Sequence, residues 1–189
     1  MAKTRTFIAI EALDEVHASA VTAIDRMRSA AENIKWVEPD NLHWTLQFLG
    51  DLSDVEMAEV CLRTVRTAAQ HEGFTVEAIG VGAFPSIQRP RTLWLGAREG
   101  AEQMVELQAS IEQALRSLGF RGENRQFVPH LTLGRASRGA GGGQLLAERL
   151  EKLSDFDGGV MGVDAVTVYA SELGRDGPTY HVLARAPLA

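Results

Sequence analysis

Two short motifs of the form His-x-Thr-Leu lie far apart in this sequence. The first is HWTL at 43–46 and the second is HLTL at 130–133. On an extended strand, residues two apart point to the same face, so each motif presents an imidazole beside a hydroxyl. The other two residues of each motif are apolar and would face the core. A single copy is typical of a strand with a structural histidine, whereas two copies in equivalent places indicate a function.

Two imidazoles and two hydroxyls that converge could hydrolyse or transfer a phosphodiester without a metal. In-line displacement at phosphorus needs a base beside the entering oxygen and an acid beside the leaving oxygen. Histidine suits both roles, because its ordinary pKa of about 6.5 lets one ring be neutral and the other charged near pH 7. Threonine hydroxyls can donate hydrogen bonds to the non-bridging oxygens. The candidate catalytic residues are therefore His43, Thr45, His130 and Thr132.

The elements that must position these motifs follow a similar order in the two halves of the chain. In the first half, hydrophobic periodicity predicts a strand at 5–10, a helix at 14–33, a strand at 43–50, a helix at 54–71 and a strand at 74–84. In the second half it predicts a strand at 92–97, a helix at 101–118, a strand at 130–135, a helix at 145–153 and strands at 162–171 and 180–186. The spacing of Ser53 and Glu56 is that of a capping box, which would begin the helix at 54–71.

This internal repetition predicts an α+β fold with two similar lobes related by an approximate twofold axis. The His-x-Thr-Leu motif opens the third element in each half, so equivalent strands would line a shared groove. A chain of 189 residues can bury about 70% of its unfolded surface around one core. We therefore expect a single bilobal domain over residues 1–189.

The composition excludes several classes of protein. The chain is 45% hydrophobic and 23% charged, unlike a disordered protein, and no stretch approaches the ~20 apolar residues of a membrane helix. The apolar run at 7–10 is too short for a secretory signal, so we expect a cytoplasmic protein that does not associate with membranes. A net charge of −6 argues against a broad basic face that coats nucleic acid, but it leaves room for a local basic site.

The sequence indicates no metal or cofactor. Cys61 is the single cysteine, so neither a disulfide nor a cysteine cluster can form within the chain. The acidic residues Asp54, Glu56 and Glu59 lie near the start of an expected helix, where they favour the helix dipole. The metal-binding spacings His-Glu-x-x-His and Cys-x-x-Cys do not occur.

The motifs in their context resemble those of a known family. The segments that carry the resemblance are RTFIAI at 5–10, NLHWTLQFLGD at 41–51, GAFP at 82–85 and FVPHLTLGR at 127–135. They are similar to segments of the 2H phosphoesterase superfamily, in particular of its bacterial and archaeal RNA 2′,3′-cyclic phosphodiesterase (LigT-like, or 2′-5′ RNA ligase) family. The resemblance covers essentially the whole chain. It implies a bilobal fold in which each lobe has an antiparallel sheet and flanking helices around a central groove.

The same resemblance implies an activity. It is the metal-independent opening of RNA 2′,3′-cyclic phosphate ends to 2′-phosphates, with reversible 2′-5′ ligation of RNA. RNA 3′ ends would be the binding partner, and we expect a monomer with no obligatory protein partner. Two alternatives stay open: a phosphodiesterase for a small cyclic or 2′-5′-linked nucleotide, and a non-catalytic module that binds RNA ends. The presence of both histidines and both threonines argues against the module, since binding alone needs no proton-transfer pair.

The resemblance also implies a role for each site residue. His43 would be the general acid that protonates the leaving 3′ oxygen, and His130 the general base that activates water. Thr45 and Thr132 would hold the phosphate oxygens. The residues alone leave the roles of the two histidines exchangeable.

Two further residues are expected to bind substrate. Phe84 matches an aromatic residue that can stack on the terminal base. Arg135 matches an arginine near the phosphate, yet it lies five residues after His130, so strict alternation would point it away from the groove. Its role requires a bend in the strand, for which Gly134 is the candidate.

Overall fold

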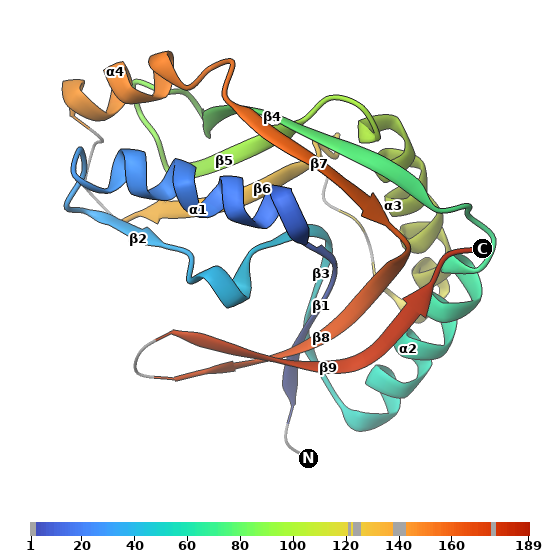
Figure 1. Cartoon of the computed structure of the whole chain (residues 1–189). Helices are drawn as coiled ribbons and strands as arrows, with labels where there is room; N and C mark the ends of the chain where they lie inside the picture. The colour runs from blue at the N-terminus through green and yellow to red at the C-terminus, as the bar shows by residue number, and fades with distance from the viewer. Residues whose placement is uncertain (1–2, 121, 123–125, 138–142, 175–176) are drawn as a thin grey trace.

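The computed structural model describes residues 3–120, 122, 126–137, 143–174 and 177–189 (Figure 1). The elements are β1 (Thr4–Glu11), α1 (Asp14–Arg28), β2 (Ile34–Trp36), η1 (Pro39–Asn41), β3 (His43–Leu52), α2 (Asp54–Ala68), β4 (Phe74–Phe84), β5 (Thr92–Ala97), α3 (Ala101–Leu115), η2 (Arg116–Leu118), β6 (His130–Ala136), α4 (Gln144–Lys152), β7 (Asp157–Val163), β8 (Ala165–Leu173) and β9 (Pro178–Pro187). The predicted α+β class is confirmed. No helix in the described ranges combines the length and the apolar content needed to cross a bilayer.

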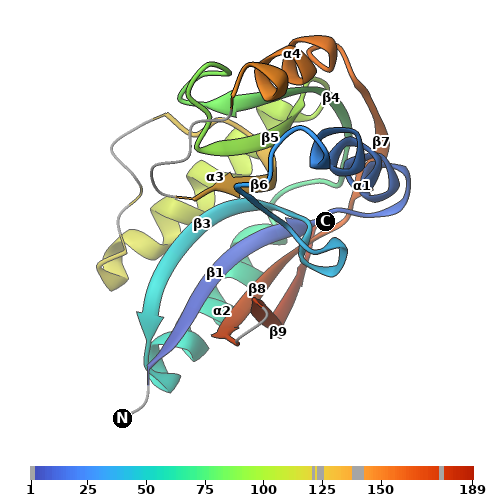
Figure 2. The same ribbon diagram turned by 90° about the vertical axis from the view of Figure 1, so that its left-hand side faces the viewer.

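The strands of the described residues form one curled antiparallel sheet (Figures 1 and 2). The strand order is β7-β4-β5-β6-β3-β1-β8-β9, and β2 pairs with β6 outside this path. The sheet therefore has two four-stranded halves, which meet where β3 pairs with β6 through Trp44 and Leu131. The two strands that open with the His-x-Thr-Leu motifs are neighbours at the centre of the molecule.

The halves of the sheet do not coincide with the halves of the chain. Strand β4 comes from the first half of the sequence but pairs with β5. Strands β8 and β9 come from the end of the chain; β8 pairs with β1, and β9 pairs with β8. Each half of the sheet is thus completed by strands from the other half of the chain. This exchange makes the two lobes interdependent and fixes β3 and β6 from both sides.

The helices cover the two sheet halves separately. Helices α1 and α4 pack against β7 and β4, and α2 packs against β9 and against α3. The predicted capping box is confirmed, since the Ser53 hydroxyl accepts a hydrogen bond from the Glu56 amide and the Glu56 carboxylate accepts one from the Ser53 amide. The expected helix at 101–118 is α3 followed by η2, and it ends at Gly119 with φ +90°.

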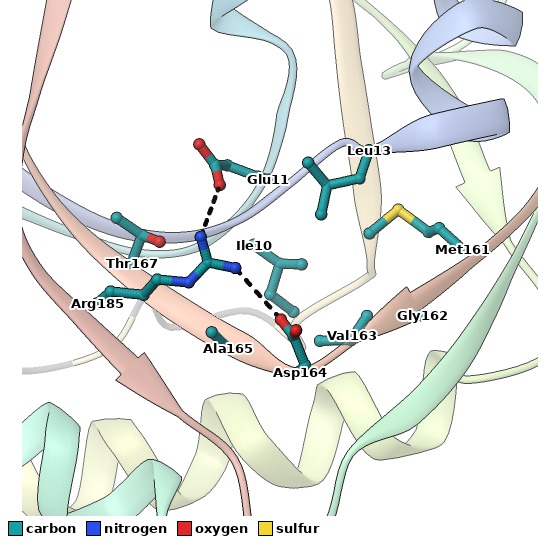
Figure 3. A pocket seen from close by; sticks show the side chains of 10 residues that line it. All are labelled: Ile10, Glu11, Leu13, Met161, Gly162, Val163, Asp164, Ala165, Thr167 and Arg185. Carbon is teal, nitrogen blue, oxygen red and sulfur yellow. Dashed lines mark hydrogen bonds and ion pairs between the residues drawn. The ribbon is translucent and has the colours of Figure 1, made fainter.

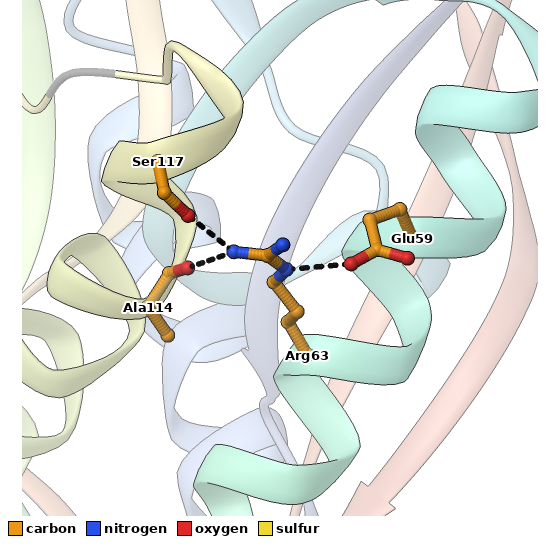
Figure 4. A network of polar contacts seen from close by, with 4 residues as sticks. All are labelled: Glu59, Arg63, Ala114 and Ser117. Carbon is orange, nitrogen blue, oxygen red and sulfur yellow. Dashed lines mark hydrogen bonds and ion pairs between the residues drawn. The ribbon is translucent and has the colours of Figure 1, made fainter.

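One arginine of α2 connects this helix to α3 and η2 through hydrogen bonds. Arg63 of α2 binds Glu59 on its own helix, with Nε 2.7 Å from Oε1, and donates from Nη1 to the Ala114 carbonyl at 3.0 Å (Figure 4). The same guanidinium donates to the Ser117 hydroxyl. Because these partners lie on α3 and η2, the contact holds the end of α3 against α2.

The sequence pattern missed two strands, β2 and β7. The strand expected at 162–171 is the end of β7 together with most of β8. Glycines that resemble chain breakers occupy the start of β7, but packing requires them there. A Cβ on Gly158 would lie 2.8 Å from the Cβ of Ala78, and one on Gly159 would lie 2.4 Å from Glu15 Cγ. The first helix also ends at Arg28, five residues before its expected end at 33.

Candidate active site

The register of β3 and β6 brings the two motifs together. Trp44 and Leu131 lie directly opposite each other and are buried. Because the strands are antiparallel, the positions on either side of this pair place His43 toward Thr132 and Thr45 toward His130. All four of these side chains are half-buried. We call the sheet side that they occupy the histidine face: it carries His43, Thr45, His130 and Thr132.

The two imidazoles are held in the same way. The Nδ1 atom of His43 lies 2.7 Å from the Asn41 carbonyl oxygen, and that of His130 lies 2.7 Å from the Val128 carbonyl oxygen. A carbonyl can only accept, so Nδ1 donates in both rings. The contact fixes the ring orientation and assigns Nε2 as the nitrogen that can exchange a proton with a bound molecule.

Aromatic side chains flank both imidazoles. The ring of His130 meets the Phe84 ring edge-on, with centroids 5.1 Å apart. His43 meets Tyr180 edge-on at 5.5 Å and also contacts the Phe7 ring at 4.9 Å. Sequence reasoning missed Phe7 and Tyr180, although the alternation of β1 could have placed Phe7 on this face. No pattern in the sequence links Tyr180 on β9 to His43 on β3.

These neighbours change the acidity of His43. Burial lowers the pKa of His43 to about 4; the hydrogen bond to the Asn41 carbonyl opposes this shift and the charge of Arg135 adds to it. His43 is therefore neutral near pH 7 in the unliganded protein. Burial also raises the pKa of Tyr180, and the charges of Arg135 and Arg5 oppose that shift.

A bulge in β6 places Arg135 on the histidine face. Thr132 pairs with Trp94 and Arg135 pairs with Thr92. The chain thus advances three positions along β6 over the same length in which it covers two positions of β5, which is a β-bulge. The Arg135 guanidinium donates from Nη1 to the Thr92 hydroxyl at 3.1 Å. The expected bend is present as this register shift, which falls between Thr132 and Gly134 rather than at Gly134. Gly134 instead allows the close approach of β2, because a Cβ there would lie 2.7 Å from Ile34 Cγ2.

The corresponding bulge in β3 exposes an aromatic ring. Thr45 pairs with Ala9 and Phe48 pairs with Phe7, so β3 also uses three residues against two. Phe48 is 56% exposed, and its ring centroid lies 6.0 Å from that of Phe7. Phe48 takes the place in β3 that Arg135 takes in β6. Sequence reasoning missed Phe48, because strict alternation from His43 directs it to the opposite face.

An ion-pair cluster lies beside the site, in a small pocket between β1 and the last strands (Figure 3). Arg185 lies 4.0 Å from a carboxylate oxygen of Glu11 and 3.4 Å from one of Asp164. Glu11 is the partner of His43 across the β1–β3 ladder, and its hydrogen bond with the Tyr169 hydroxyl contributes, after burial, to raising the pKa of Tyr169. These contacts hold β9 against the strand next to His43.

The arrangement provides proton transfer and anion binding. Two imidazoles with fixed Nδ1–H tautomers can act as acid and base, two hydroxyls can donate hydrogen bonds, and Arg135 supplies a positive charge. Within the described ranges, no group of three or more His, Cys, Asp and Glu side chains has an arrangement that could hold a metal ion. The groups present are those that phosphodiester chemistry uses.

The chain is similar to proteins of known name. A model described as the 2′-5′ RNA ligase superfamily matches residues 14–175. An RNA 2′,3′-cyclic phosphodiesterase of Methanothermobacter thermautotrophicus is 37% identical over 179 residues, which cover 94% of this chain and 95% of that protein. A Thermotoga maritima protein of the same name is 32% identical over 182 residues, covering 95% and 92%.

Solved structures agree with the sequence comparisons. The protein TT0787 of Thermus thermophilus superposes with a TM-score of 0.82 at 28% identity and covers 97% of both chains. E. coli LigT, solved with 3′-AMP, gives a TM-score of 0.77 at 27% identity and covers 99% of both chains. The family match includes both His-x-Thr-Leu motifs, and the similarity extends over nearly the whole fold. The chain therefore belongs to the 2′-5′ RNA ligase superfamily and has the 2H phosphoesterase fold.

Proposed function

We propose that this protein is an RNA 2′,3′-cyclic phosphodiesterase that opens the cyclic phosphate at an RNA 3′ end to a 2′-phosphate. The observation that carries the proposal is the pair of His-x-Thr motifs on adjacent antiparallel strands, with each Nδ1 hydrogen-bonded to a backbone carbonyl. The curated relatives that bear this name support it. The same step, with the 5′-hydroxyl of a second RNA attacking phosphorus in place of water and the 3′ oxygen leaving, would join RNA ends through a 2′-5′ linkage, and its reversal would cleave that linkage.

The reaction needs one proton taken and one proton given. In our proposal, His130 Nε2 accepts a proton from water as the water oxygen bonds to phosphorus. His43 Nε2–H donates a proton to the 3′ oxygen as the bond from phosphorus to that oxygen breaks. Thr45 and Thr132 donate hydrogen bonds to the non-bridging oxygens, and Arg135 balances their negative charge. The two histidines regain their starting protonation states by exchange with solvent.

The low pKa of His43 bears directly on this assignment. A pKa of about 4 leaves His43 neutral at pH 7, which suits a base and favours the exchanged roles in the unliganded protein. A bound phosphate anion raises the pKa of a neighbouring imidazole, because it stabilises the protonated ring. The assignment of His43 as the acid therefore depends on the substrate to charge it.

A sulfur-substituted substrate distinguishes the two assignments. A thiolate leaves without protonation far more readily than an alkoxide, so sulfur in place of the bridging 3′ oxygen removes the need for an acid. If His43 is the acid, His43→Ala should lose much less activity on this substrate than on the oxygen substrate, while His130→Ala loses activity equally on both. The opposite pattern would exchange the roles.

The function itself is tested with an oligonucleotide that ends in a 2′,3′-cyclic phosphate, incubated in chelator. We expect conversion to the 2′-phosphate, and a loss of at least ~10² in turnover for either His43→Ala or His130→Ala. His181→Ala is the matched control, because that exposed side chain lies near Glu172 rather than on the histidine face. Full activity in both motif variants, or product binding without cleavage from pH 5 to 9, would refute the proposal.

The remaining parts of the proposal concern the surroundings of the reaction. Phe84 and the exposed Phe48 offer aromatic rings for the terminal base, a contact that tolerates any base. The proposal includes a monomer and a cytoplasmic location. The single Cys61, which leaves no disulfide to form within the chain, supports a reducing compartment.

A further inference from the structure

Two cationic side chains lie directly opposite each other on neighbouring strands of the sheet. Lys35 of β2 is the partner of Arg135 of β6 in an antiparallel ladder, and both side chains are exposed. Like charges in directly opposite positions destabilise a sheet. Among the described residues, neither side chain lies within 4.0 Å of a carboxylate oxygen, and Arg135 donates to the Thr92 hydroxyl instead.

Both charges are on the side of the sheet that carries the catalytic candidates. Ile34 is buried and approaches the Gly134 backbone from the opposite face, so the intervening Lys35 points the same way as Arg135. The charge of Arg135 reaches His43 and contributes to lowering its pKa. The cationic pair therefore begins at the reaction site and extends one strand beyond it, to the edge strand β2.

The positions of Thr132 and Arg135 along β6 determine how far the cationic pair lies from the reacting phosphate. Strands β3 and β2 use the same edge of β6, with Trp44 opposite Leu131 and Lys35 opposite Arg135. From Thr132 to Arg135 the strand advances about 10 Å, less the shortening at the bulge. An anion between Lys35 and Arg135 would thus be separate from the one at the two threonines, yet on the same face as His43.

We propose that Lys35 and Arg135 bind a second phosphate of the substrate, the internucleotide phosphate on the 5′ side of the terminal nucleotide. The inference rests on the proposed function and specifies its substrate class: RNA ends of at least two nucleotides, in preference to cyclic mononucleotides. An internucleotide phosphate neutralises the repulsion between the two cations, so part of the binding free energy comes from relief of an unfavourable pairing.

The three lysines of the sequence, Lys3, Lys35 and Lys152, give a matched set of variants. Each is changed to Gln, and kcat/KM is measured for a 2′,3′-cyclic mononucleotide and for a dinucleotide with the same cyclic end. We expect Lys35→Gln to lower kcat/KM for the dinucleotide on the order of 10-fold, mainly through KM, and to change the mononucleotide value less than twofold. Lys152→Gln, at the end of α4, should alter neither value.

The possible outcomes distinguish failure of the second phosphate site from failure of the proposed function. A wild-type protein that cleaves neither substrate refutes the proposed function. Cleavage of both substrates with an unchanged dinucleotide value in Lys35→Gln refutes the second subsite. A loss in Lys3→Gln instead would place the 5′ phosphate beside Arg5 and Lys3, at the other end of β1, and would equally refute it.

A stability measurement tests the charge pair without any substrate. Lys35→Gln should raise the Tm at low salt, and the gain should shrink as salt screens the repulsion. Lys152→Gln should not raise it, since that lysine lies in the last turn of α4, where a positive charge is favourable. An unchanged or lower Tm in Lys35→Gln would contradict the unfavourable pairing from which the inference starts.

Discussion

His43 and His130 share one backbone arrangement but differ in their surroundings. Each Nδ1 atom donates to the carbonyl two residues earlier in the chain. His43, however, lies between Phe7 and Tyr180 and is also close to the charge of Arg135. An acid and base pair requires one ring to be neutral while the other is charged, and burial with the charge of Arg135 keeps His43 neutral near pH 7 until an anion binds.

The acidity of His43 predicts how stability depends on pH. The pKa of this side chain falls from 6.5 in the unfolded chain to about 4 in the folded protein. The unfolded chain therefore binds more protons in this interval, and the stability that is present above pH 6.5 is lost as the pH falls toward 4. The full shift corresponds to roughly 3 kcal/mol in the free energy of unfolding.

Chemical denaturation at a series of pH values checks this prediction. His43→Asn keeps a polar side chain but cannot titrate, so its free energy of unfolding should vary less than that of the wild type between pH 6.5 and 4. His17→Asn changes a half-buried histidine on α1, away from the histidine face, and serves as the control. Identical pH dependence in the wild type and His43→Asn would contradict the lowered pKa.

The strands β3 and β6 place their side chains through bulges, which sequence periodicity could not locate. The alternation of each motif correctly predicts one face for His43 and Thr45, and the same face for His130 and Thr132. After the threonine of each motif, the extra residue of the bulge reverses the face to which the following side chains point. For this reason strict periodicity directs both Arg135 and Phe48 away from the histidine face. The resemblance still identified Arg135 as a substrate-binding residue, whereas Phe48 was not predicted.

Gly134 follows the β6 bulge and is the residue that lets β2 pack closely against β6. A Cβ there would lie 2.7 Å from Ile34 Cγ2 and 2.9 Å from Trp36 Cε3, so Gly134→Ala must push β2 away. We expect a destabilisation of about 1–3 kcal/mol and a fall in kcat/KM, because Arg135 and Lys35 both move with the displaced backbone. Equilibrium unfolding and steady-state kinetics measure the two effects.

Gly162→Ala in β7 is the control for that substitution. A Cβ at Gly162 would meet no atom within 4 Å, so its change to alanine should leave stability and activity nearly unaltered. Equal effects of the two substitutions would show that loss of a strand glycine, rather than the close approach of β2, governs the result.

The predictable part of the fold is the part governed by local signals. The capping box at Ser53, the helix end at Gly119 and the bounds of β4 and β5 follow from the nearby sequence and agree with the structure. Strand β7 was missed because its glycines are needed for a close approach to β4 and α1, which are distant in sequence. A residue required by a tertiary contact can thus have the local signal of a turn.

At the scale of the whole molecule, the two His-x-Thr-Leu motifs predicted two related lobes but not how the chain builds them. Strand β4 completes the half of the sheet that contains β6, and β8 and β9 complete the half that contains β3. Strand exchange of this kind depends on long-range pairing, for which one sequence holds no signal. It also brings Tyr180 of β9 to His43, a contact no local pattern could predict.

The net charge of −6 limits how much of an RNA strand this molecule can bind. The catalytic phosphate and the phosphate at Lys35 are the two contacts that the proposals provide. Binding to single strands loses about 0.7 units of log K per neutralised phosphate for each unit of log salt concentration, so we expect a slope of about −1.4. Affinity for the 2′-phosphate product should rise from one nucleotide to two and then level off.

Titrations with products of one, two, four and ten nucleotides, each at several salt concentrations, test this limit. A plateau from the dinucleotide onward, with the same shallow slope for every longer product, is the expected result. The acidic surface should repel the rest of the strand, so the protein should select an end rather than a length of RNA. Affinity that keeps rising to ten nucleotides, with a slope several times steeper, would instead require a basic track beyond Lys35 and would contradict an enzyme that holds only the terminus.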